Sequence, residues 1–205
     1  MHLNILNSNQ QKLFPLLAKF NKEFYMVGGT AIAIHIGHRF SIDFDLFKVG
    51  NIKHKSILKK FEEQKEEVNI IFKDDNQLHL SCRGVKFTFF DFEFEVPHPI
   101  TVQNFITIPS LLDLAAMKAY ALGRRSKWKD YADLFFILKN YYSLIEISKR
   151  AEEIFGDLFN EKLFRGQLSY FNGISFEEQI EYLPGFETEE SVIKDFLTEA
   201  ALTGF

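Results

Sequence analysis

The segment from Phe24 to Phe47, with the sequence FYMVGGTAIAIHIGHRFSIDFDLF, constrains the fold of this chain more than any other stretch. It begins with an apolar run that ends at Gly28 and Gly29, and an alanine-rich stretch follows. After a basic corner the chain becomes apolar again and carries two acids, Asp43 and Asp45. This order predicts a strand, a glycine turn, a short helix and a second strand.

The two acids of the second predicted strand share one face. Side chains two residues apart on a strand point the same way, so Asp43 and Asp45 project together while Phe44 and Leu46 point to the core. Two neighbouring carboxylates repel each other unless a cation lies between them, and a divalent metal ion is the usual cation. The pair therefore predicts a site for Mg²⁺ or Mn²⁺.

The glycine turn adds a second chemical signal. A turn without side chains lets backbone N–H groups approach a phosphate group, and the N-terminus of the following helix favours the same anion. Neither motif is specific alone, because Asp-x-Asp occurs in many surface strands and Gly-Gly is most often a plain turn. In this order and at this spacing the two motifs predict the metal and nucleotide site of a nucleotidyltransferase.

A third carboxylate is the usual companion of such a pair. Nucleotidyl transfer with two metal ions generally needs one more acid on a neighbouring strand. Asp91 is our candidate metal ligand, because the preceding residues of its strand face, Val85, Phe87 and Phe89, are apolar. The alternative is that the strand runs out into solvent at this point, so that Asp91 and the acids after it are ordinary exposed residues.

Two blocks of the sequence resemble the AbiEii/AbiGii-type toxin nucleotidyltransferases of bacterial abortive-infection and toxin–antitoxin systems. The first is GGTAIAIHIGHRFSIDFDLF, from Gly28 to Phe47, and the second is IPSLLDLAAMKAYALGRRSKWKDYADLFFIL, from Ile108 to Leu138. Together they cover about a quarter of the chain. The resemblance implies an α/β (α+β) fold: a nucleotidyltransferase-type mixed sheet with flanking helices, followed by a C-terminal helical bundle.

The resemblance also implies a function. It indicates a metal-dependent toxin that transfers a nucleoside monophosphate from an NTP to an acceptor hydroxyl and that has a cognate antitoxin. We favour an RNA 3′ end, such as that of a tRNA, as the acceptor because transfer there would stop translation. A protein hydroxyl or a small molecule is the alternative acceptor. A catalytically inactive NTP-binding regulatory protein of the same fold is our second hypothesis, and an interaction module with a Phe-rich surface is the third.

Lys118 stands out in the second block. A helix there would place Leu114, Ala115 and Leu122 on one apolar stripe, and Lys118 falls within that stripe. Such a lysine either extends its ammonium group to solvent or is held in place for an anionic partner. The resemblance marks this lysine as a functional position, so we predict that Lys118 binds the nucleotide phosphates.

The motif KDYADL supplies two further acids. Asp130 and Asp133 lie three residues apart, so they share a helix face from which both can reach Lys118 or the metal site. The resemblance places an acid of this motif in the active site, and both are therefore catalytic candidates. One would orient Lys118 and the other would assist the acceptor hydroxyl, in either order. Ordinary acids at the start of a helix are the alternative, which explains Asp130 better than Asp133.

The remaining candidates are polar groups beside these motifs. Thr30 is predicted to hold the triphosphate, and Ser41 either binds phosphate or caps the strand. Arg39 is a candidate nucleotide-binding residue. Together with His38 and a basic turn it could also guide an RNA backbone toward the metals, although the arginines of the turn could instead bind only the triphosphate or pair with acids. The basic turn consists of Arg124, Arg125, Lys127 and Lys129.

Composition limits the other functions open to the chain. The single cysteine, Cys82, excludes an internal disulfide and is typical of a reducing compartment. We expect a cytoplasmic protein without a membrane partner, because the chain has neither a targeting signal nor an apolar run near the ~20 residues that span a bilayer. The formal charge of −4 disfavours a surface that binds phosphate throughout. The 24 phenylalanines are expected to fill the core.

The pattern along the chain predicts two domains. Strands are expected up to about residue 94, including a hairpin with its turn at Arg83 and Gly84. After Pro97, Pro99 and Pro109 the pattern becomes helical to the end. We therefore expect a nucleotidyltransferase α/β core over residues 1–100 and a C-terminal helical domain over residues 101–205, with the boundary between Pro97 and Pro109.

Overall fold

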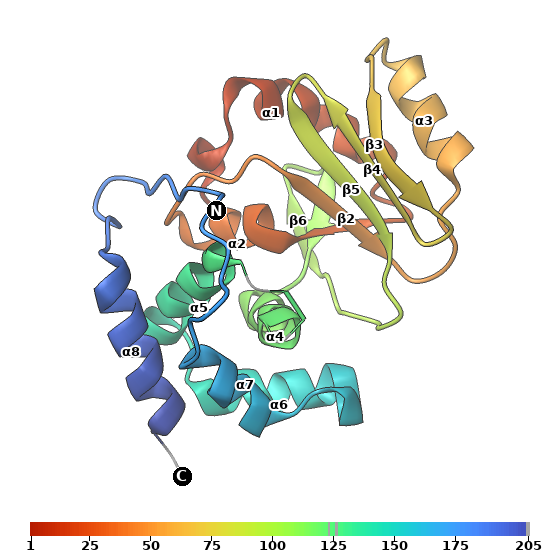
Figure 1. The fold of residues 1–205 in the computed structure, drawn as a ribbon. Helices are drawn as coiled ribbons and strands as arrows, with labels where there is room; N and C mark the ends of the chain where they lie inside the picture. Colours follow the sequence, from red (N-terminus) through yellow and green to blue (C-terminus); the bar gives the residue numbers. More distant parts are fainter. Residues whose placement is uncertain (123, 126, 204–205) are drawn as a thin grey trace. The chain divides into compact units, whose positions relative to one another are not determined.

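The structure is a computed structural model that describes residues 1–122, 124–125 and 127–203. The chain divides into two compact units, Met1–Ser110 and Leu111–Phe205. The first unit contains all the named strands, and the second contains helices α4 to α8 (Figure 1).

The first unit is built on a five-stranded mixed sheet with the order β1-β2-β5-β4-β3. Strands β2 and β5 run parallel, and the other neighbours are antiparallel. The mixed sheet that the sequence predicted is therefore confirmed. The strands are β1 (Tyr25–Val27), β2 (Phe44–Lys48), β3 (Asn69–Asp74), β4 (Gln77–Cys82) and β5 (Val85–Asp91).

One face of this sheet is buried under helices and carries most of the core. Alternate residues of β2, β4 and β5 are fully buried there, as the period of two requires. The ring of Phe20 lies 5.0 Å from that of Phe89, and Phe61 lies 5.1 Å from Phe87, so phenylalanine does fill the core. The helical segments of this unit are η1 (Leu3–Ile5), α1 (Ser8–Leu13), η2 (Phe14–Lys19), α2 (Gly28–Ile36) and α3 (His54–Glu63), of which η1 and η2 are 3₁₀ helices.

Helix α2 joins β1 to β2 and places the glycine pair directly at its start. Gly28 is the first helical residue and has a φ of 75°. This left-handed conformation is costly for residues with a Cβ, which is why the strand turns into the helix at a glycine. The helix ends at Gly37, again in the left-handed region with a φ of 70°, as many helices do.

The β4–β5 hairpin forms where the sequence predicted it, because Arg83 and Gly84 both adopt positive φ, 50° and 77°. The helical pattern expected after the three prolines is present from Leu111 onward, but strands at residues 100–108 were not predicted. They form a second hairpin of β6 (Ile100–Val102) and β7 (Ile106–Ile108) within the first unit, which extends to Ser110. The β-branched residues of these short segments favour strands.

The second unit is helical. Helix α4 packs against α5, α6 and α7, and α8 packs against α5 and α7. Trp128 is 5% exposed and stacks on Tyr131 and Phe176, so it acts as a packing anchor. No helix in the described parts of either unit is long and apolar enough to cross a membrane. The elements are α4 (Leu111–Leu122), α5 (Trp128–Asn140), α6 (Leu144–Phe155), the 3₁₀ helix η3 (Gly156–Leu158), α7 (Glu161–Leu168) and α8 (Glu190–Leu202).

Candidate active site

The glycine turn and the acidic strand of the first unit lie in contact. The β1–β2 register pairs Val27 with Asp45, so the carboxylate falls beside the turn that follows Val27. A Cβ on Gly28 would lie 2.1 Å from Oδ2 of Asp45. The absence of a side chain at residue 28 therefore makes the space that the Asp45 carboxylate occupies. This arrangement places a carboxylate directly at the N-terminus of α2.

The second glycine makes room for a cation. A Cβ on Gly29 would lie 2.4 Å from Nη2 of Arg39 and 3.2 Å from Oγ of Ser41. Arg39 is 2% exposed, and its Nη1 donates a hydrogen bond to the Phe40 carbonyl at 3.0 Å. The start of α2 thus combines backbone N–H groups, a guanidinium group and a hydroxyl group, all of which bind phosphate oxygens.

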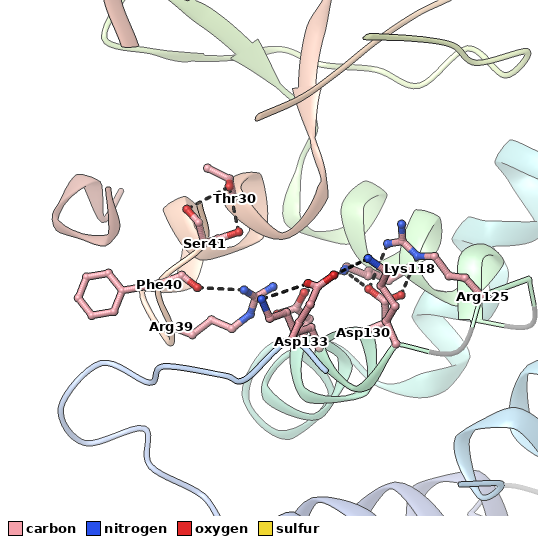
Figure 2. A network of polar contacts seen from close by, with 11 residues as sticks. Thr30, Arg39, Phe40, Ser41, Lys118, Arg125, Asp130 and Asp133 are labelled. Carbon is pink, nitrogen blue, oxygen red and sulfur yellow. Dashed lines mark hydrogen bonds and ion pairs between the residues drawn. The ribbon is translucent and has the colours of Figure 1, made fainter. Parts of the chain in front are cut away.

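Thr30 joins the start of α2 to the segment that leads into β2. Its hydroxyl contacts Oγ of Ser41 at 2.9 Å and the backbone carbonyl of Asp43, as Figure 2 shows for Ser41. Thr30 is 1% exposed, so its hydroxyl group contacts protein groups and not solvent. The structure places Thr30 where it positions Ser41 and the acidic strand.

The carboxylates of Asp43 and Asp45 fit a magnesium ion that is shared with a nucleotide. No cluster of three or more His, Cys, Asp or Glu side chains suited to a metal occurs among the described residues. Mg²⁺ is commonly held by one or two carboxylates together with substrate phosphates and water, rather than by a cage of protein ligands. The Asp45 carboxylate lies at the start of α2, and Asp43 directly precedes β2, so one or both acids could supply such ligands. Mn²⁺ accepts the same oxygen ligands.

The strand register does not bring Asp91, our candidate third metal ligand, next to Asp45. In the parallel β2–β5 pair, Asp45 lies opposite Thr88, and Asp91 lies opposite Lys48. Asp91 is therefore three residues further along, about 10 Å, and on the other face of the sheet. Its Oδ1 accepts a hydrogen bond from the Gly50 backbone N–H at 2.7 Å. Its role is to hold the loop after β2.

The face that Asp45 shares carries polar residues that the sequence reasoning missed. Thr88 lies opposite Asp45, and His79 of β4 lies opposite Thr88. Burial lowers the pKa of His79, Lys86 lowers it further, and the charge of Asp45 acts in the opposite direction. The alternation of polar and apolar residues in β4 and β5 could have predicted this polar face. The apolar residues of that pattern are fully buried: Leu78, Leu80, Phe87 and Phe89.

Lys118 of the second unit is held between two acids. Its Nζ forms an ion pair with Asp130 and a second with Oδ2 of Asp133 at 3.0 Å (Figure 2). The three side chains are 6%, 2% and 0% exposed, so the lysine does not extend to solvent. The expectation that both acids can reach Lys118 is confirmed. Such buried charges persist only when they are paired.

The charge of Asp130 is fixed by two cations. Arg125 donates from Nε to Oδ2 of Asp130 at 2.8 Å, opposite the contact with Lys118. Burial by itself would raise the pKa of the Asp130 carboxyl, but Lys118 and Arg125 together outweigh it and hold that pKa below its ordinary value. Asp130 is therefore a carboxylate at neutral pH and pairs with both Lys118 and Arg125.

The cations of the basic turn all have partners within the second unit. Arg124 lies 3.6 Å from the centre of the Tyr120 ring and donates to the Tyr120 and Leu158 carbonyls. Lys127 and Lys129 both pair with Glu178. Arg125 pairs with Asp130. Because protein groups engage all four cations, the structure favours the alternative in which they pair within the protein over a path for an RNA backbone.

Comparison with known proteins identifies relatives that match most of the length of this chain. The family model described as "Nucleotidyl transferase AbiEii toxin, Type IV TA system" matches residues 13–198. An uncharacterised protein of Aquifex aeolicus is 28% identical over 176 residues, which cover 84% of this chain and 85% of that protein.

Two solved structures share the fold. JHP933 from Helicobacter pylori superposes with a TM-score of 0.62 at 14% identity, covering 94% of this chain and 88% of that chain. MenT4, a nucleotidyltransferase toxin from Mycobacterium tuberculosis, superposes with a TM-score of 0.61 at 13% identity, covering 94% of this chain and 81% of that chain. At such identities the likeness establishes the fold, which is that of nucleotidyltransferases.

Proposed function

Because this chain belongs to the AbiEii nucleotidyl transferase toxin family and is therefore a nucleotidyltransferase toxin, we propose that it modifies RNA in a metal-dependent reaction. The reaction transfers a nucleoside monophosphate from an NTP to the 3′ hydroxyl of an RNA, with a tRNA as the preferred acceptor. Family membership implies an NTP substrate and an antitoxin partner. We also propose that the protein acts in the cytoplasm as part of an abortive-infection system. The identity of the RNA acceptor and the need for a metal ion are likewise parts of this proposal.

The glycine turn and its surroundings bind the triphosphate in this proposal. The backbone N–H groups of Gly28 and Gly29 point at the phosphates from the start of a nine-residue helix, where the helix dipole also favours an anion. Arg39 and Ser41 lie against Gly29 and donate to the same phosphates. Thr30 keeps Ser41 in place through its hydroxyl contact of 2.9 Å.

Asp43 and Asp45 would hold Mg²⁺ or Mn²⁺ against the phosphates. The bound metal supplies charge neutralisation at the phosphate oxygens and lowers the pKa of the attacking hydroxyl. The protein fixes the Asp45 carboxylate by setting it into the space left by Gly28, and it holds the Asp43 backbone through the contact of its carbonyl with the Thr30 hydroxyl. Strand β2 adds rigidity because it pairs on both sides, with β1 and with β5.

Lys118 of the second unit binds the nucleotide phosphates through its ammonium group in this proposal. Asp130 and Asp133 keep the charged Nζ in one position, and Arg125 keeps Asp130 ionised. Both acids pair with Lys118, so in this proposal one of them orients Lys118 and the other assists removal of the hydroxyl proton.

The reaction itself is a displacement at the α-phosphorus. The acceptor 3′ oxygen attacks the α-phosphorus, a new O–P bond forms, and the bond to the β-phosphate oxygen breaks so that pyrophosphate leaves with the electron pair. The hydroxyl proton passes to a carboxylate or to water. Catalysis consists of positioning and charge neutralisation, as in other phosphoryl transfers.

One observation carries this proposal: the Asp45 carboxylate lies at the glycine turn, with 2.1 Å between its Oδ2 and the missing Cβ of Gly28. A metal-binding acid and a phosphate-binding turn meet there within one rigid unit. The test is incorporation of each α-labelled NTP into total RNA with Mg²⁺ or Mn²⁺, comparing the wild type with Asp43→Asn. Label on RNA from the wild type alone supports the proposal, and equal labelling by the variant overturns the site.

A second candidate function rests on the missing third acid. With Asp91 on the other sheet face, no third carboxylate of the described residues joins Asp43 and Asp45. This favours, as an alternative, a catalytically inactive NTP-binding regulatory protein of the same fold. The two functions separate in the same experiment, because the regulatory protein binds a labelled NTP in a metal-dependent way but transfers no label to any acceptor.

A further inference from the structure

A row of side chains crosses the sheet from the Asp45 carboxylate to the edge strand. The strand registers pair Asp45 with Thr88, Thr88 with His79, and His79 with Phe72. Paired residues of neighbouring strands project from the same face, so these four side chains lie on one face in one line. Three strand spacings make the row about 14 Å long.

The β3 strand contains an irregularity that completes this row. The register shifts between Ile70 and Phe72, so that Ile70 lies opposite Leu80 and Phe72 lies opposite His79. Without the extra residue at Ile71, regular alternation would turn Phe72 to the opposite face. The bulge thus delivers an aromatic ring to the face of Asp45, where it lies 5.7 Å from the His79 ring and is 47% exposed.

The direction of the proposed reaction indicates from which side of Asp45 the acceptor approaches. The triphosphate lies at the glycine turn, on the β1 side of Asp45, so pyrophosphate leaves on that side. Attacking and leaving oxygens stand roughly in line at phosphorus, and the acceptor must therefore approach from the other side of Asp45. The sheet order puts β5, β4 and β3 on that side.

We propose that Thr88, His79 and Phe72 form the binding site for the 3′-terminal, single-stranded nucleotides of the RNA acceptor. This inference rests on the proposed function and adds where the acceptor lies. The exposed ring of Phe72 stacks on an unpaired base, as aromatic residues on RNA-binding sheets do. The His79 ring is held by the hydrogen bond between its Nε2 and Oε1 of Gln77 at 2.9 Å, so its Nδ1 can accept from a base edge. Lys86 of the same face adds positive charge for a phosphate. Thr88, beside Asp45, contacts the terminal ribose.

The test measures binding of a labelled single-stranded RNA oligonucleotide to the full chain, which requires no transfer. Phe72→Ala should weaken the RNA affinity by about tenfold. Phe72→Trp should retain the affinity, because it keeps the stacking surface. Ile70→Ala is the matched control: it lies on the same strand, is 39% exposed and lies opposite Leu80 of the buried face. His79→Ala should weaken RNA binding as well.

The readouts separate an acceptor site from a structural effect. Phe72→Ala and His79→Ala should have the same melting temperature as Ile70→Ala and the same affinity for NTP in the presence of Mg²⁺. In transfer assays these two variants should have a higher KM for RNA and an unchanged kcat. RNA binding equal to that of Ile70→Ala, or no RNA binding by the wild type, would overturn the inference, as would labelling of a protein in place of RNA. Bound RNA without transfer would instead sink the proposed function.

Discussion

The carboxylate of Asp45 occupies the space of the side chain that Gly28 lacks, with its Oδ2 at 2.1 Å from the position of the missing Cβ. Gly28 also has a φ of 75°, which residues with a Cβ rarely adopt. Two independent reasons therefore require glycine at this point. The relationship joins the glycine turn at the start of α2 to strand β2 and makes their geometry interdependent.

Gly28→Ala should abolish transfer. The new Cβ displaces the Asp45 carboxylate, and displacements of about 1 Å in such sites cost on the order of 100-fold in rate. The backbone strain at positive φ should lower the free energy of unfolding by about 1–2 kcal/mol. Gly84→Ala is the control, since Gly84 has a φ of 77° and an added Cβ would meet nothing within 4 Å. It should lose similar stability in urea unfolding and keep its activity. Equal activities of the two variants would contradict the role of the Asp45 contact.

Asp91→Asn should leave transfer within about twofold of the wild type, because Asp91 faces away from Asp45. The asparagine can still accept the hydrogen bond from the Gly50 N–H, so the loss of unfolding free energy should stay below about 1 kcal/mol. Asp45→Asn, assayed in parallel, should be inactive. A loss of activity in Asp91→Asn comparable to that in Asp45→Asn would restore Asp91 as a metal ligand.

Lys118→Met should remove activity and also lower the free energy of unfolding by about 3 kcal/mol, because it removes the buried cation that Asp130 and Asp133 share. The double variant Lys118→Met/Asp130→Asn also removes the charge of one of these two acids. It should regain part of the lost stability and remain inactive. A double-mutant cycle on unfolding free energies and transfer rates measures both effects. Activity in the double variant, or strictly additive stability losses, would refute the assignment of Lys118.

Glu178 provides a prediction for acid pH. The hydrogen bond from Lys127, opposed by burial and aided by Lys129, lowers the pKa of Glu178 from 4.5 to about 2. A lowered pKa in the folded state means that the ionised group stabilises the fold above pH 4.5, and that this contribution disappears as the pH falls toward 2. The stability gap between wild type and Glu178→Gln should therefore be widest at neutral pH and narrow below pH 4.5.

The size of this gap should be at most about 1 kcal/mol, because the Glu178 side chain is 48% exposed and solvent screens its pairs. Urea unfolding at a series of pH values measures it, and added salt should reduce it. A gap that stays constant as the medium is acidified would show that the pairs with Lys127 and Lys129 do not form.

Local pattern was sufficient for the elements that carry the chemistry. The strand, glycine turn, helix and acidic strand were readable because each has its own short-range signal, and the Arg83–Gly84 turn of the hairpin likewise. The pairing of Lys118 with two acids followed from helical spacing. The hairpin after Pro97 was missed because each of its strands is only three residues long, which is too short to show an alternating pattern of polar and apolar residues.

Strand register could not be read from the sequence, and it decided two assignments. Asp91 ends an apolar strand face, which made it a reasonable metal ligand until the pairing of Asp45 with Thr88 set the two acids on opposite faces. The line from Thr88 to His79 and Phe72 depends on three pairings and one bulge. Such relationships are long-range, because they join strands that are distant in sequence.

The measurement that tests the central claim most directly compares two labels on the same NTP. Wild-type protein is incubated with RNA, Mg²⁺ and NTP labelled at either the α- or the γ-phosphate, and the label on RNA and in pyrophosphate is counted. Nucleotidyl transfer predicts that the α label appears on RNA and the γ label in pyrophosphate, with neither found for Asp45→Asn. Transfer of the γ label to an acceptor, or α labelling that persists in Asp45→Asn, would contradict the account.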